Sequence, residues 1–404
     1  MLLKLAWRNI WRNKRHSAIV VGSVIVGVIA VILMDGLTSG MLYQMLFNQI
    51  SSSVSHIQIH KKGFNDNKVV QSFMPDYYKA EDVVKENTSV QSYSKKVVSF
   101  GLLSSASSSS GVFINGINPS GEEKVTKIKN SIVEGSYLTG NKREIVIGKD
   151  LADKLNSKLG DKVVILTNTP DGTISSDVFR IVGTYETFSS AFDKAYIYIP
   201  LENAQQMLDI GDNIHELSII TKDYGQVNKV KEQIVSKLSD EYEVLSYKDM
   251  LPLLLVQIDL YKQSMFITDV IIGLALIFGI INVMLMAVFE RIQEFGVLMS
   301  IGMKNSKLFL MIIIEALIIG VIGTVIGIVI GILIEIPLSY IGIDLSLFAE
   351  SLKSFGSGAI IYPVIVPENL IGVLIIIPFI SIVGAIYPAY KAIKLEPVSA
   401  IRYV

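Results

Sequence analysis

The sequence predicts a membrane protein with four transmembrane helices and a large α+β domain between the first and second of them. Half of the 404 residues are hydrophobic, only 18% are charged, and the mean hydropathy is +0.49. This exceeds what a soluble chain of this length needs for its core. Four apolar windows interrupt the chain, and a long polar stretch separates the first window from the second.

Each window is long enough to cross a bilayer, because about 20 apolar residues in a helix satisfy their own backbone polar groups in hydrocarbon. The windows are Ser17–Met34, Val270–Phe289, Leu308–Ile334 and Leu370–Tyr390. We expect the first to be retained, because it lacks the small-residue cleavage site of a signal peptide. Pro378 and Pro388 in the last window should bend or end that helix locally.

Basic residues near the window ends predict the orientation. The first 16 residues hold five Lys and Arg and no acid, and Lys and Arg also flank the third window and follow the fourth. The segment 337–367 has a single basic residue, Lys353. Because basic loops stay inside, we expect a multi-pass protein of the inner (plasma) membrane, with both termini in the cytoplasm.

The polar stretch between the first two windows predicts a folded α+β domain outside the membrane. Short β-rich runs such as "GVFINGI" and "DKVVIL" alternate with helical patterns such as "NKVKEQIVSKLSD". The chain has no cysteine. The domain must therefore depend on its hydrophobic core rather than on disulfides.

The predicted organisation runs in order from the N-terminus. The segments are a cytoplasmic amphipathic helix at 1–16, a first span at 17–37, the extracytoplasmic domain with its stalk at 38–262, a second span at 263–289, a cytoplasmic helix at 290–307, a third span at 308–336, an extracytoplasmic loop at 337–367, a fourth span at 368–390 and a cytoplasmic tail at 391–404. In the first segment an apolar stripe with Trp7 and Trp11 lies opposite Arg8 and Arg12, as in interfacial helices.

No catalytic motif stands out. The stretch "GSYLTGNK" approaches a phosphate-binding loop, but Asn141 occupies the place of the required lysine. His56 and His60 on one strand would lie roughly 13 Å apart, too far to share a metal ion. We therefore expect a non-enzymatic chain without cofactor, metal or nucleic acid, whose energy comes from a partner.

The charged stretch between the second and third windows, "FERIQEFGVLMSIGMKNSK", predicts a short amphipathic helix. Ile292, Phe295 and Met299 recur at helical spacing, and Glu290 and Glu294 lie at the N-terminal end, where carboxylates suit the helix dipole. Periodicity alone leaves two interpretations. One is a passive helix in the headgroup layer, and the other is a docking helix for a cytoplasmic protein.

This stretch resembles the signature of the FtsX-like/MacB-type ABC transporter permease family, E-R-x-x-E-x-G-x-L-x-x-x-G before a glycine-rich span. The matching positions are Glu290, Arg291, Glu294, Gly296, Leu298 and Gly302. The closing "YPAYKAIKLEPVSAIRY" is similar to the family's C-terminal segment. Residues 263–404 thus resemble an FtsX-like permease domain.

The polar domain extends the resemblance. "FINGINPSGEEKVTKIKNSIVEGSYL" and "REIVIGKDLADKLNSKLGDKVVIL" resemble the MacB-like periplasmic core. The order of these motifs is most similar to lipoprotein-releasing, Lol-type permeases, as are "WRNIWRNKRH" before the first span and "MDGL" after it.

The resemblance implies a division of labour between chains. A coupling helix between spans two and three would contact a separate cytoplasmic ABC ATPase, which binds the ATP. The residues implied in coupling are Glu290, Arg291, Glu294, Phe295, Gly296, Met299 and Gly302. A complete transporter would need a second permease chain, identical or paralogous, in contact with membrane lipid.

Two features of the third span predict helix contacts. Gly320, Gly323, Gly327 and Gly331 permit close backbone approach, and we expect packing against a neighbouring span, with a dimer seam as the alternative. Glu315 is expensive in lipid and should face protein or the headgroup zone. Snorkelling, an interhelical hydrogen bond and ion transport remain open for it.

The resemblance implies release of lipoproteins from the inner membrane for delivery to the outer membrane. A periplasmic carrier would contact the hairpin Thr167–Asp177, with Pro170, Asp171 and Gly172 at its tip. The hairpin is short, which leaves carrier binding open. The alternatives are MacB-type export of peptides or drugs from the periplasm, FtsX-type regulation of cell-wall hydrolases, and a membrane receptor without an ATPase.

Overall fold

The computed structural model describes residues 2–12, 14–74 and 76–394, and the chain divides into two units. We call the first the helical unit; it combines Met1–Leu42, Gln257–Asp344 and Ile360–Val404. The second is the β-rich unit, which combines Tyr43–Val256 with Leu345–Ala359.

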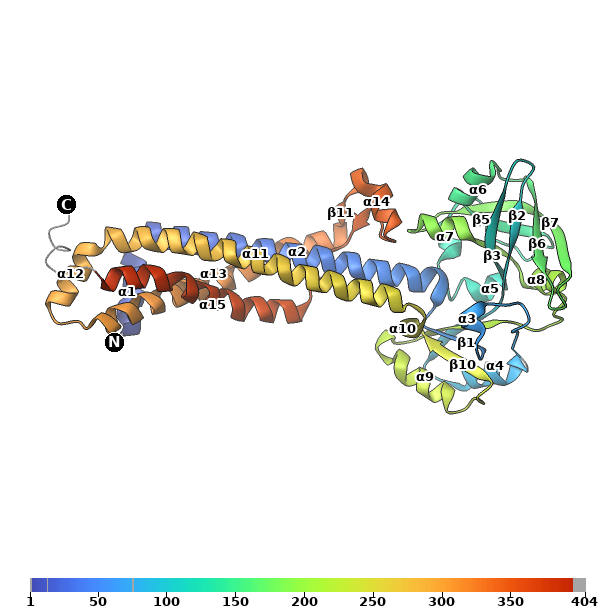
Figure 1. Cartoon of the computed structure of the whole chain (residues 1–404), viewed down its shortest axis with the longest axis horizontal. Coiled ribbons are helices and arrows are strands. Elements are labelled where there is room, and N and C mark those ends of the chain that lie inside the picture. The colour runs from blue at the N-terminus through green and yellow to red at the C-terminus, as the bar shows by residue number, and fades with distance from the viewer. Residues whose placement is uncertain (1, 13, 75, 395–404) are drawn as a thin grey trace. The chain divides into compact units, whose positions relative to one another are not determined.

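Four long helices of the helical unit are apolar and long enough to cross a membrane (Figure 1). They are α2 (Lys14–Gln49), α11 (Pro252–Glu290), α13 (Asn305–Ile341) and α15 (Pro367–Ile393). Each contains one of the apolar windows. Four such helices with a large α/β domain between the first two confirm the predicted fold class.

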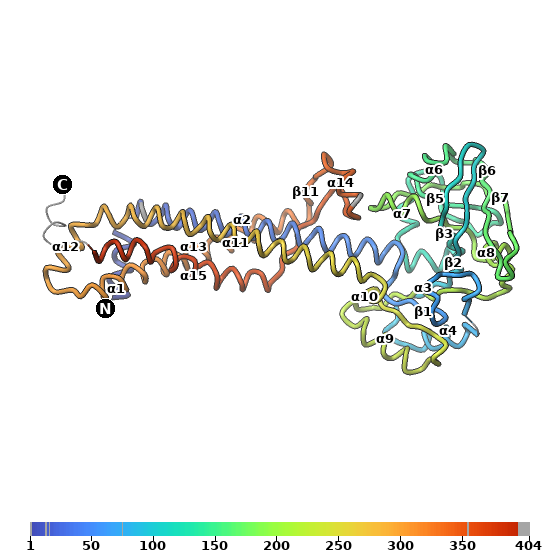
Figure 2. The backbone as a smooth tube through the Cα atoms, viewed as in Figure 1, coloured from blue at the N-terminus to red at the C-terminus, as the bar shows by residue number. Residues whose placement is uncertain are grey.

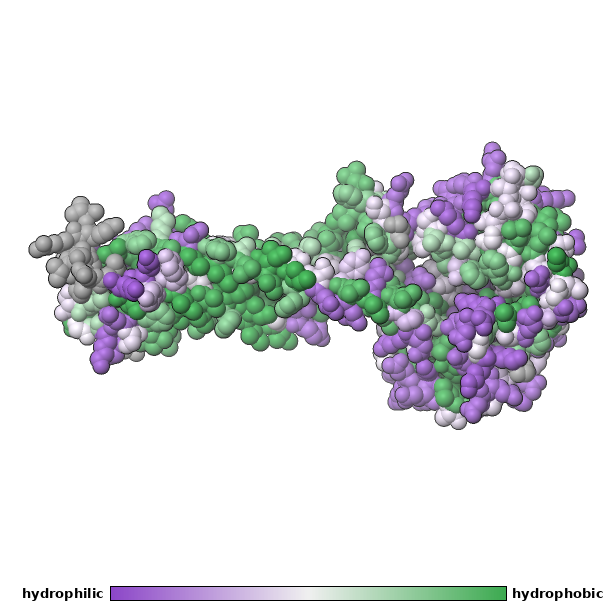
Figure 3. All heavy atoms as spheres, viewed as in Figure 1, coloured by the Kyte–Doolittle hydropathy of each residue, from purple (hydrophilic) through white to green (hydrophobic). Residues whose placement is uncertain are grey.

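The surface of these helices is apolar along most of its length. Figure 3 shows hydrophobic side chains over the visible face of the four long helices and hydrophilic ones over much of the β-rich unit. On α11, Phe266, Ile271 and Phe278 are each more than 60% exposed. Such large exposed apolar residues are stable in contact with lipid rather than water.

The glycines of α13 allow its neighbours to approach closely. A Cβ on Gly323 or Gly327 would lie 2.8 Å from the Cβ of Val24 or Val28 on α2. Gly331 faces Ile32 of α2 in the same way, and Gly320 faces Ser381 of α15. The four glycines therefore contact helices of the same chain. The helix α15 continues through Pro378 and Pro388 without ending at either.

Two short helices accompany the long ones. Helix α1 (Leu2–Arg12) buries Ala6 and Ile10 and exposes Trp7 and Trp11. Helix α12 (Ile292–Ser300) connects α11 to α13. After α13, the strands β11 (Ile343–Asp344) and β12 (Ile360–Ile361) pair antiparallel. Between them lie a 3₁₀ turn, Ser346–Phe348, and α14 (Ala349–Ser354).

One mixed sheet organises the β-rich unit. Its strand order is β10-β1-β9-β2-β3-β8-β5-β7-β4, and β6 pairs with β2 and β7. The strands are β1 (Ile57–Lys61), β2 (Val90–Ser104), β3 (Ser109–Ile117), β4 (Ile132–Gly135), β5 (Glu144–Gly148), β6 (Lys162–Asn168), β7 (Ile174–Tyr185), β8 (Tyr196–Pro200), β9 (Glu216–Thr221) and β10 (Tyr242–Ser246). The backbone tube in Figure 2 follows the long antiparallel pair β2 and β3.

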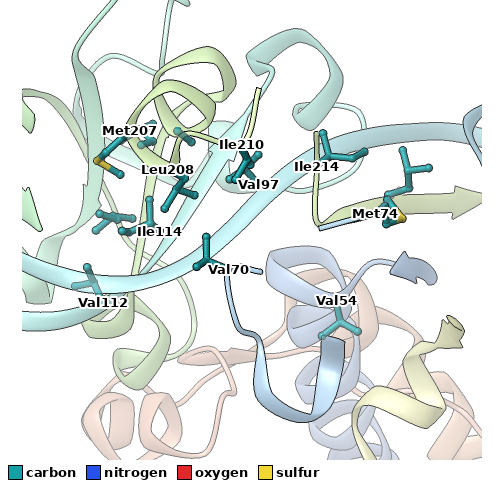
Figure 4. Close-up of a cluster of buried hydrophobic side chains, with 14 of the residues drawn as sticks. Val54, Val70, Met74, Val97, Val112, Ile114, Met207, Leu208, Ile210 and Ile214 are labelled. Atoms are coloured by element: carbon teal, nitrogen blue, oxygen red, sulfur yellow. The ribbon is translucent and has the colours of Figure 1, made fainter. Parts of the chain in front are cut away.

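Short helices complete the β-rich unit. They are α3 (Phe64–Asn67), α4 (Tyr77–Glu86), α5 (Pro119–Glu122), α6 (Lys149–Leu155), α7 (Ser190–Ala195), α8 (Leu201–Leu208), α9 (Val227–Val235) and α10 (Tyr247–Met250). The main core includes Val97 and Ile114 of the sheet, Leu208 of α8 and the connecting residue Ile214 (Figure 4). Because the chain has no cysteine, this apolar packing stabilises the unit without disulfides.

A charge network lies inside the same unit. The Nζ of Lys96 lies 2.9 Å from Oε1 of Glu122 and 3.6 Å from Oε1 of Glu216, and all three residues are buried. His60 Nε2 lies 3.4 Å from Oε2 of Glu216. Burial favours a neutral Glu216, but the positive charge of Lys96 together with His60 and the Ser218 hydroxyl outweighs it and lowers the pKa of Glu216 to about 2.

Candidate functional site

The helical geometry of the backbone is interrupted on both sides of α12, between it and the long helices α11 and α13. Arg291 leaves helical geometry between α11 and α12, with φ −108° and ψ 15°. At the other end Gly302 has φ +99°, in the left-handed region that favours glycine. Its N–H donates to the carbonyl of Met299 at 3.0 Å. The chain then turns and enters α13 at Asn305.

The buried face of α12 joins the core of the helical unit. Ile292 and Phe295 are 2% and 1% exposed, and Gly296 is buried as well. Phe295 belongs to the same apolar cluster as Leu308 and Met311 of α13. Helix α12 is therefore seated on the bundle by packing.

The opposite face of α12 exposes apolar side chains. Val297 is 47% exposed, and Ile301, just past the helix, is 81% exposed. Glu290, Gln293 and Ser300 are exposed around them. An aliphatic pair with a polar surround is typical of a surface that another protein can cover.

Ion pairs connect α12 to two other helices. Arg291 Nη1 donates to Oε1 and Oε2 of Glu315, on α13, at 3.1 and 3.3 Å. Arg291 Nε donates to Oε2 of Glu294 at 3.2 Å, and Arg12 of α1 donates to the same Glu294 oxygen. The series of ion pairs Arg12–Glu294–Arg291–Glu315 thus joins α1, α12 and α13.

The members of this series differ in burial, and so in energetic weight. Arg291 and Glu315 are 6% and 8% exposed. Removing one partner of such a buried pair would leave an uncompensated charge. The side chains of Arg12 and Glu294 are 57% and 43% exposed, and pairs open to solvent contribute little. The Arg291–Glu315 pair is therefore the part of the series that fixes α12 to α13, and it gives Glu315 an interhelical partner.

The residues that the sequence implied in coupling fall on different faces. Arg291, Phe295 and Gly296 are buried, whereas Glu290 and Gly302 are exposed. Glu294 and Met299 are half-buried. Sequence reasoning missed Val297 and Ile301, because the family signature marks positions without saying which face they occupy. A helical projection of the sequence could have found them, because it places both residues on the face opposite Phe295.

The β6–β7 hairpin is short and internally bonded. Its turn closes with a hydrogen bond from Thr169 N–H to the Thr173 carbonyl at 2.9 Å. Thr169 Oγ1, Thr173 N–H and Thr173 Oγ1 all donate to Asp171, and these bonds lower its pKa. Gly172 has φ +85°. At the tip, Asp171 and Gly172 are exposed and Pro170 is half-buried.

Lys353 of α14 contacts three carboxylates within the β-rich unit. Its Nζ lies 2.9 Å from Glu186 Oε1, 3.6 Å from Asp193 Oδ2 and 3.9 Å from Asp150 Oδ1. Burial opposes the positive charge, but the Glu186 hydrogen bond and the two aspartates outweigh it and raise the pKa of Lys353. Lys353 therefore bonds Leu345–Ala359 to the rest of the β-rich unit, to which this stretch belongs.

Comparison with protein families gives two adjacent matches. The model of the MacB-like periplasmic core domain matches residues 17–237, and the model of the FtsX-like permease C-terminal region matches residues 266–397. The first match alone covers more than half of the chain.

Individual relatives match over most of the chain at 22% identity. The ABC transporter permease YknZ of Bacillus subtilis aligns with 99% of this chain and 98% of its own length. The lipoprotein-releasing system transmembrane protein LolC of Neisseria meningitidis covers 75% of each chain. The macrolide export ATP-binding/permease protein MacB 2 of Yersinia pestis aligns with 99% of this chain and 57% of its own length.

Two solved structures match parts of the chain at 16% sequence identity. The extracellular domain of a YknZ transporter from Gram-positive bacteria covers 48% of this chain and 100% of its own, with a TM-score of 0.35. The periplasmic region of MacB from Actinobacillus actinomycetemcomitans covers 55% and 96%, with a TM-score of 0.36.

Proposed function

The chain belongs to the family of ABC transporter permeases with a MacB-like periplasmic core and an FtsX-like C-terminal region, and we propose that it transmits ATP-driven movement from a separate cytoplasmic ATPase to its β-rich unit. The resemblance to the FtsX-like/MacB-type permease family is thereby confirmed. The observation that carries the proposal is α12, which is fixed to α13 by the buried Arg291–Glu315 pair and exposes Val297 and Ile301.

Charge distribution supports a cytoplasmic position for α12. The basic residues of α1, together with Lys304 and Lys307 at the start of α13, lie near α12, as the positive-inside rule favours. Both termini would then be cytoplasmic and the β-rich unit would lie outside the membrane. In this orientation the exposed face of α12 is available to a cytoplasmic ATPase.

Continuous helices support transmission through the membrane. Helix α11 begins soon after strand β10 of the β-rich unit and ends at α12. Helix α13 begins soon after α12 and leads into the segment that carries Lys353. A push on α12 would therefore act on two rigid helices, each covalently continuous with a part of the β-rich unit.

The contact with the ATPase can be tested by charge insertion. We expect Ile301→Asp to weaken association with the ATPase about tenfold, or about 1.4 kcal/mol, because a carboxylate would be buried in the contact. The matched control is Ile341→Asp, since Ile341 is also a highly exposed isoleucine but lies at the far end of α13. Co-purification and ATPase stimulation of the reconstituted complex measure the effect. Equal behaviour of the two variants would contradict the docking role.

For substrate, the lead candidate is lipoprotein release from the inner membrane. It is supported by the motif order of the β-rich unit and by relatives named as lipoprotein-releasing proteins. Depletion of the protein, followed by fractionation of lipoproteins between membranes, tests it. Accumulation in the inner membrane is the expected result, and normal delivery to the outer membrane would refute it.

Export of small molecules or peptides is the second candidate. It is supported by near-complete alignment with a macrolide export protein and by the brevity of the β6–β7 hairpin, which offers a carrier little surface. Unchanged lipoprotein distribution together with increased sensitivity to exported compounds in the depleted cells would favour this candidate.

A further inference from the structure

A second buried glutamate of α13 has no basic partner. Glu335 is 1% exposed, and its Oε1 makes no hydrogen bond with the residues that the structure describes. It lines a small cavity together with Asp35 of α2, which is 9% exposed, and Asn369 of α15. The remaining wall is largely aliphatic, and the cavity has room for roughly one water molecule.

The backbone of α2 makes space for the Glu335 carboxyl group. A Cβ on Gly36 would lie 1.7 Å from Oε1 of Glu335. Any residue other than glycine at this position would therefore displace the carboxyl group. The carbonyl of Gly36 already accepts a hydrogen bond from the N–H of Val364 at 3.0 Å. Asn369 Nδ2 donates to Oδ2 of Asp35 at 3.3 Å. These contacts seat Glu335 against α2 and join Asp35 to α15.

The groups that face the pair from the packed helices are polar or acidic. Asn369 comes from α15, and Asp269 of α11 acts electrostatically on Asp35. Among the described residues, neither acid forms an ion pair with a lysine, arginine or histidine. By contrast, Glu315 of the same helix is neutralised by Arg291.

Two buried carboxylates without a cation cannot both remain ionised. An isolated buried charge is so unfavourable that the group takes up a proton instead, and carboxyl groups that share a site keep one proton between them. A hard metal ion would need six or more oxygen ligands. The described residues contain no group of three side chains suited to a metal. A proton is the ligand that fits the cavity.

The site lies where a proton could be exchanged. Glu335 follows Glu315 by 20 residues, or about 30 Å along a helix. This equals the thickness of the hydrocarbon core. With Glu315 near one boundary of the bilayer, Glu335 reaches the other.

From this geometry we infer that Asp35 and Glu335 form a proton-binding site that joins α2 to α13. The shared proton stabilises the two helices in contact. Its release leaves two facing carboxylates, whose repulsion favours separation of the helices at this end. The site would thereby make the movement of α2 against α13 dependent on pH at the membrane boundary. This inference does not depend on which substrate the transporter moves.

Infrared spectroscopy of the full chain in lipid vesicles tests the site directly. At neutral pH we expect the carbonyl band of a protonated carboxyl group, and in Glu335→Gln we expect the band to disappear at lower pH, because the Glu335 carboxylate then no longer faces Asp35. Glu315→Gln is the matched control and should leave the band, since Glu315 is ion-paired. Absence of the band from the natural chain, or an unchanged pH dependence of the band in Glu335→Gln, would overturn the inference.

A disulfide pair measures the contact of the helices independently of that spectrum. The chain has no cysteine, and an ideal Cβ on Gly331 lies 3.4 Å from Cβ of Ile32, close to disulfide geometry. In the double variant Ile32→Cys and Gly331→Cys, we expect cross-linking to fall as pH rises, although thiols react faster at higher pH. With Glu335→Gln added, it should rise with pH.

Two outcomes of the cross-linking experiment would count against a shared proton. Identical pH profiles with and without Glu335→Gln would show that the acids do not control the helix contact. A profile that changes when a chelator is added would indicate a bound metal ion in place of the proton, and this too would overturn the inference.

Discussion

The two buried glutamates of α13 have the same side chain and the same helix but opposite surroundings. Glu315 accepts two hydrogen bonds from Arg291, whereas Glu335 faces Asp35 and an amide. Burial of a carboxylate is unfavourable in both places. At one end the chain supplies a cation, and at the other the geometry favours a proton. The comparison shows that the partner, not the burial, determines what a buried acid does.

The largest loss of stability should come from removing Arg291, the cation that pairs with Glu315 of α13. We expect Arg291→Met to destabilise the folded chain by about 3–5 kcal/mol, because Glu315 would remain buried and uncompensated. Denaturant unfolding in detergent micelles measures this loss. The double variant Arg291→Met with Glu315→Leu should recover most of it. A double variant as unstable as the single one would contradict the comparison.

Glu216, a buried glutamate of the β-rich unit, extends the comparison to pH. The pKa of Glu216 is lowered to about 2, so its contribution to stability is complete above its ordinary pKa of 4.5 and is lost as pH falls towards 2. We expect the free energy of unfolding of this unit to fall by roughly 3 kcal/mol over that range. Hydrogen exchange of β9 in the full chain measures it.

The control for that prediction removes the charge of Glu216. In Glu216→Gln the dependence of β9 exchange on pH in this range should largely disappear, although the unit is less stable throughout. A variant that keeps the natural pH profile would assign the acid sensitivity to other carboxylates.

Crowding the carboxyl group of Glu335, the glutamate of α13 without a basic partner, should destabilise the folded chain less. Gly36→Ala places a methyl group against the Glu335 carboxyl group, and such overpacking typically costs about 1–3 kcal/mol. Gly22→Ala on the same helix is the matched control, because nothing lies within 4 Å of its Cβ position. Thermal unfolding of the two variants separates crowding from helix propensity. Combining Gly36→Ala with Glu335→Ala should relieve the crowding, and failure to do so would argue against it.

The smallest loss of stability is expected at Lys353. Its side chain is 22% exposed, and Asp193 keeps its hydrogen bonds from Thr187, so Lys353→Met should cost about 1 kcal/mol. If the Lys353 contacts transmit movement of α13, the variant should nevertheless reduce substrate transport while ATP hydrolysis continues. Transport assays of the reconstituted complex measure this. Normal transport would limit Lys353 to a structural role.

Composition and spacing were sufficient to predict much of the fold. The four apolar windows predict helices because hydrocarbon excludes unsatisfied backbone groups, and the structure places each window inside one long helix. The stretch around Phe295 was predicted as a short amphipathic helix for a similar reason. Which of its residues would face outward required the packing of Phe295 and the pairing of Arg291, which depend on distant elements.

The acids of the proton site could not be recognised from the sequence. The first and third windows end at Met34 and Ile334, and Asp35 and Glu335 are the residues that directly follow them. The two residues lie 300 positions apart in the chain. Their meeting depends on how α2 and α13 rotate about their axes, which the Gly323–Val24 and Gly327–Val28 contacts determine.

The spacing of Glu315 and Glu335 also gives α13 a fixed hydrophobic length. The two acids are held about 30 Å apart along one rigid helix. In a bilayer of different thickness, one acid cannot move to the membrane boundary without moving the other. A thicker membrane would draw one of them into hydrocarbon unless the lipid thins around the protein. The positions of the two acids thus fix the bilayer thickness that α13 matches best. A change in lipid composition that alters this thickness would change the environment of both side chains.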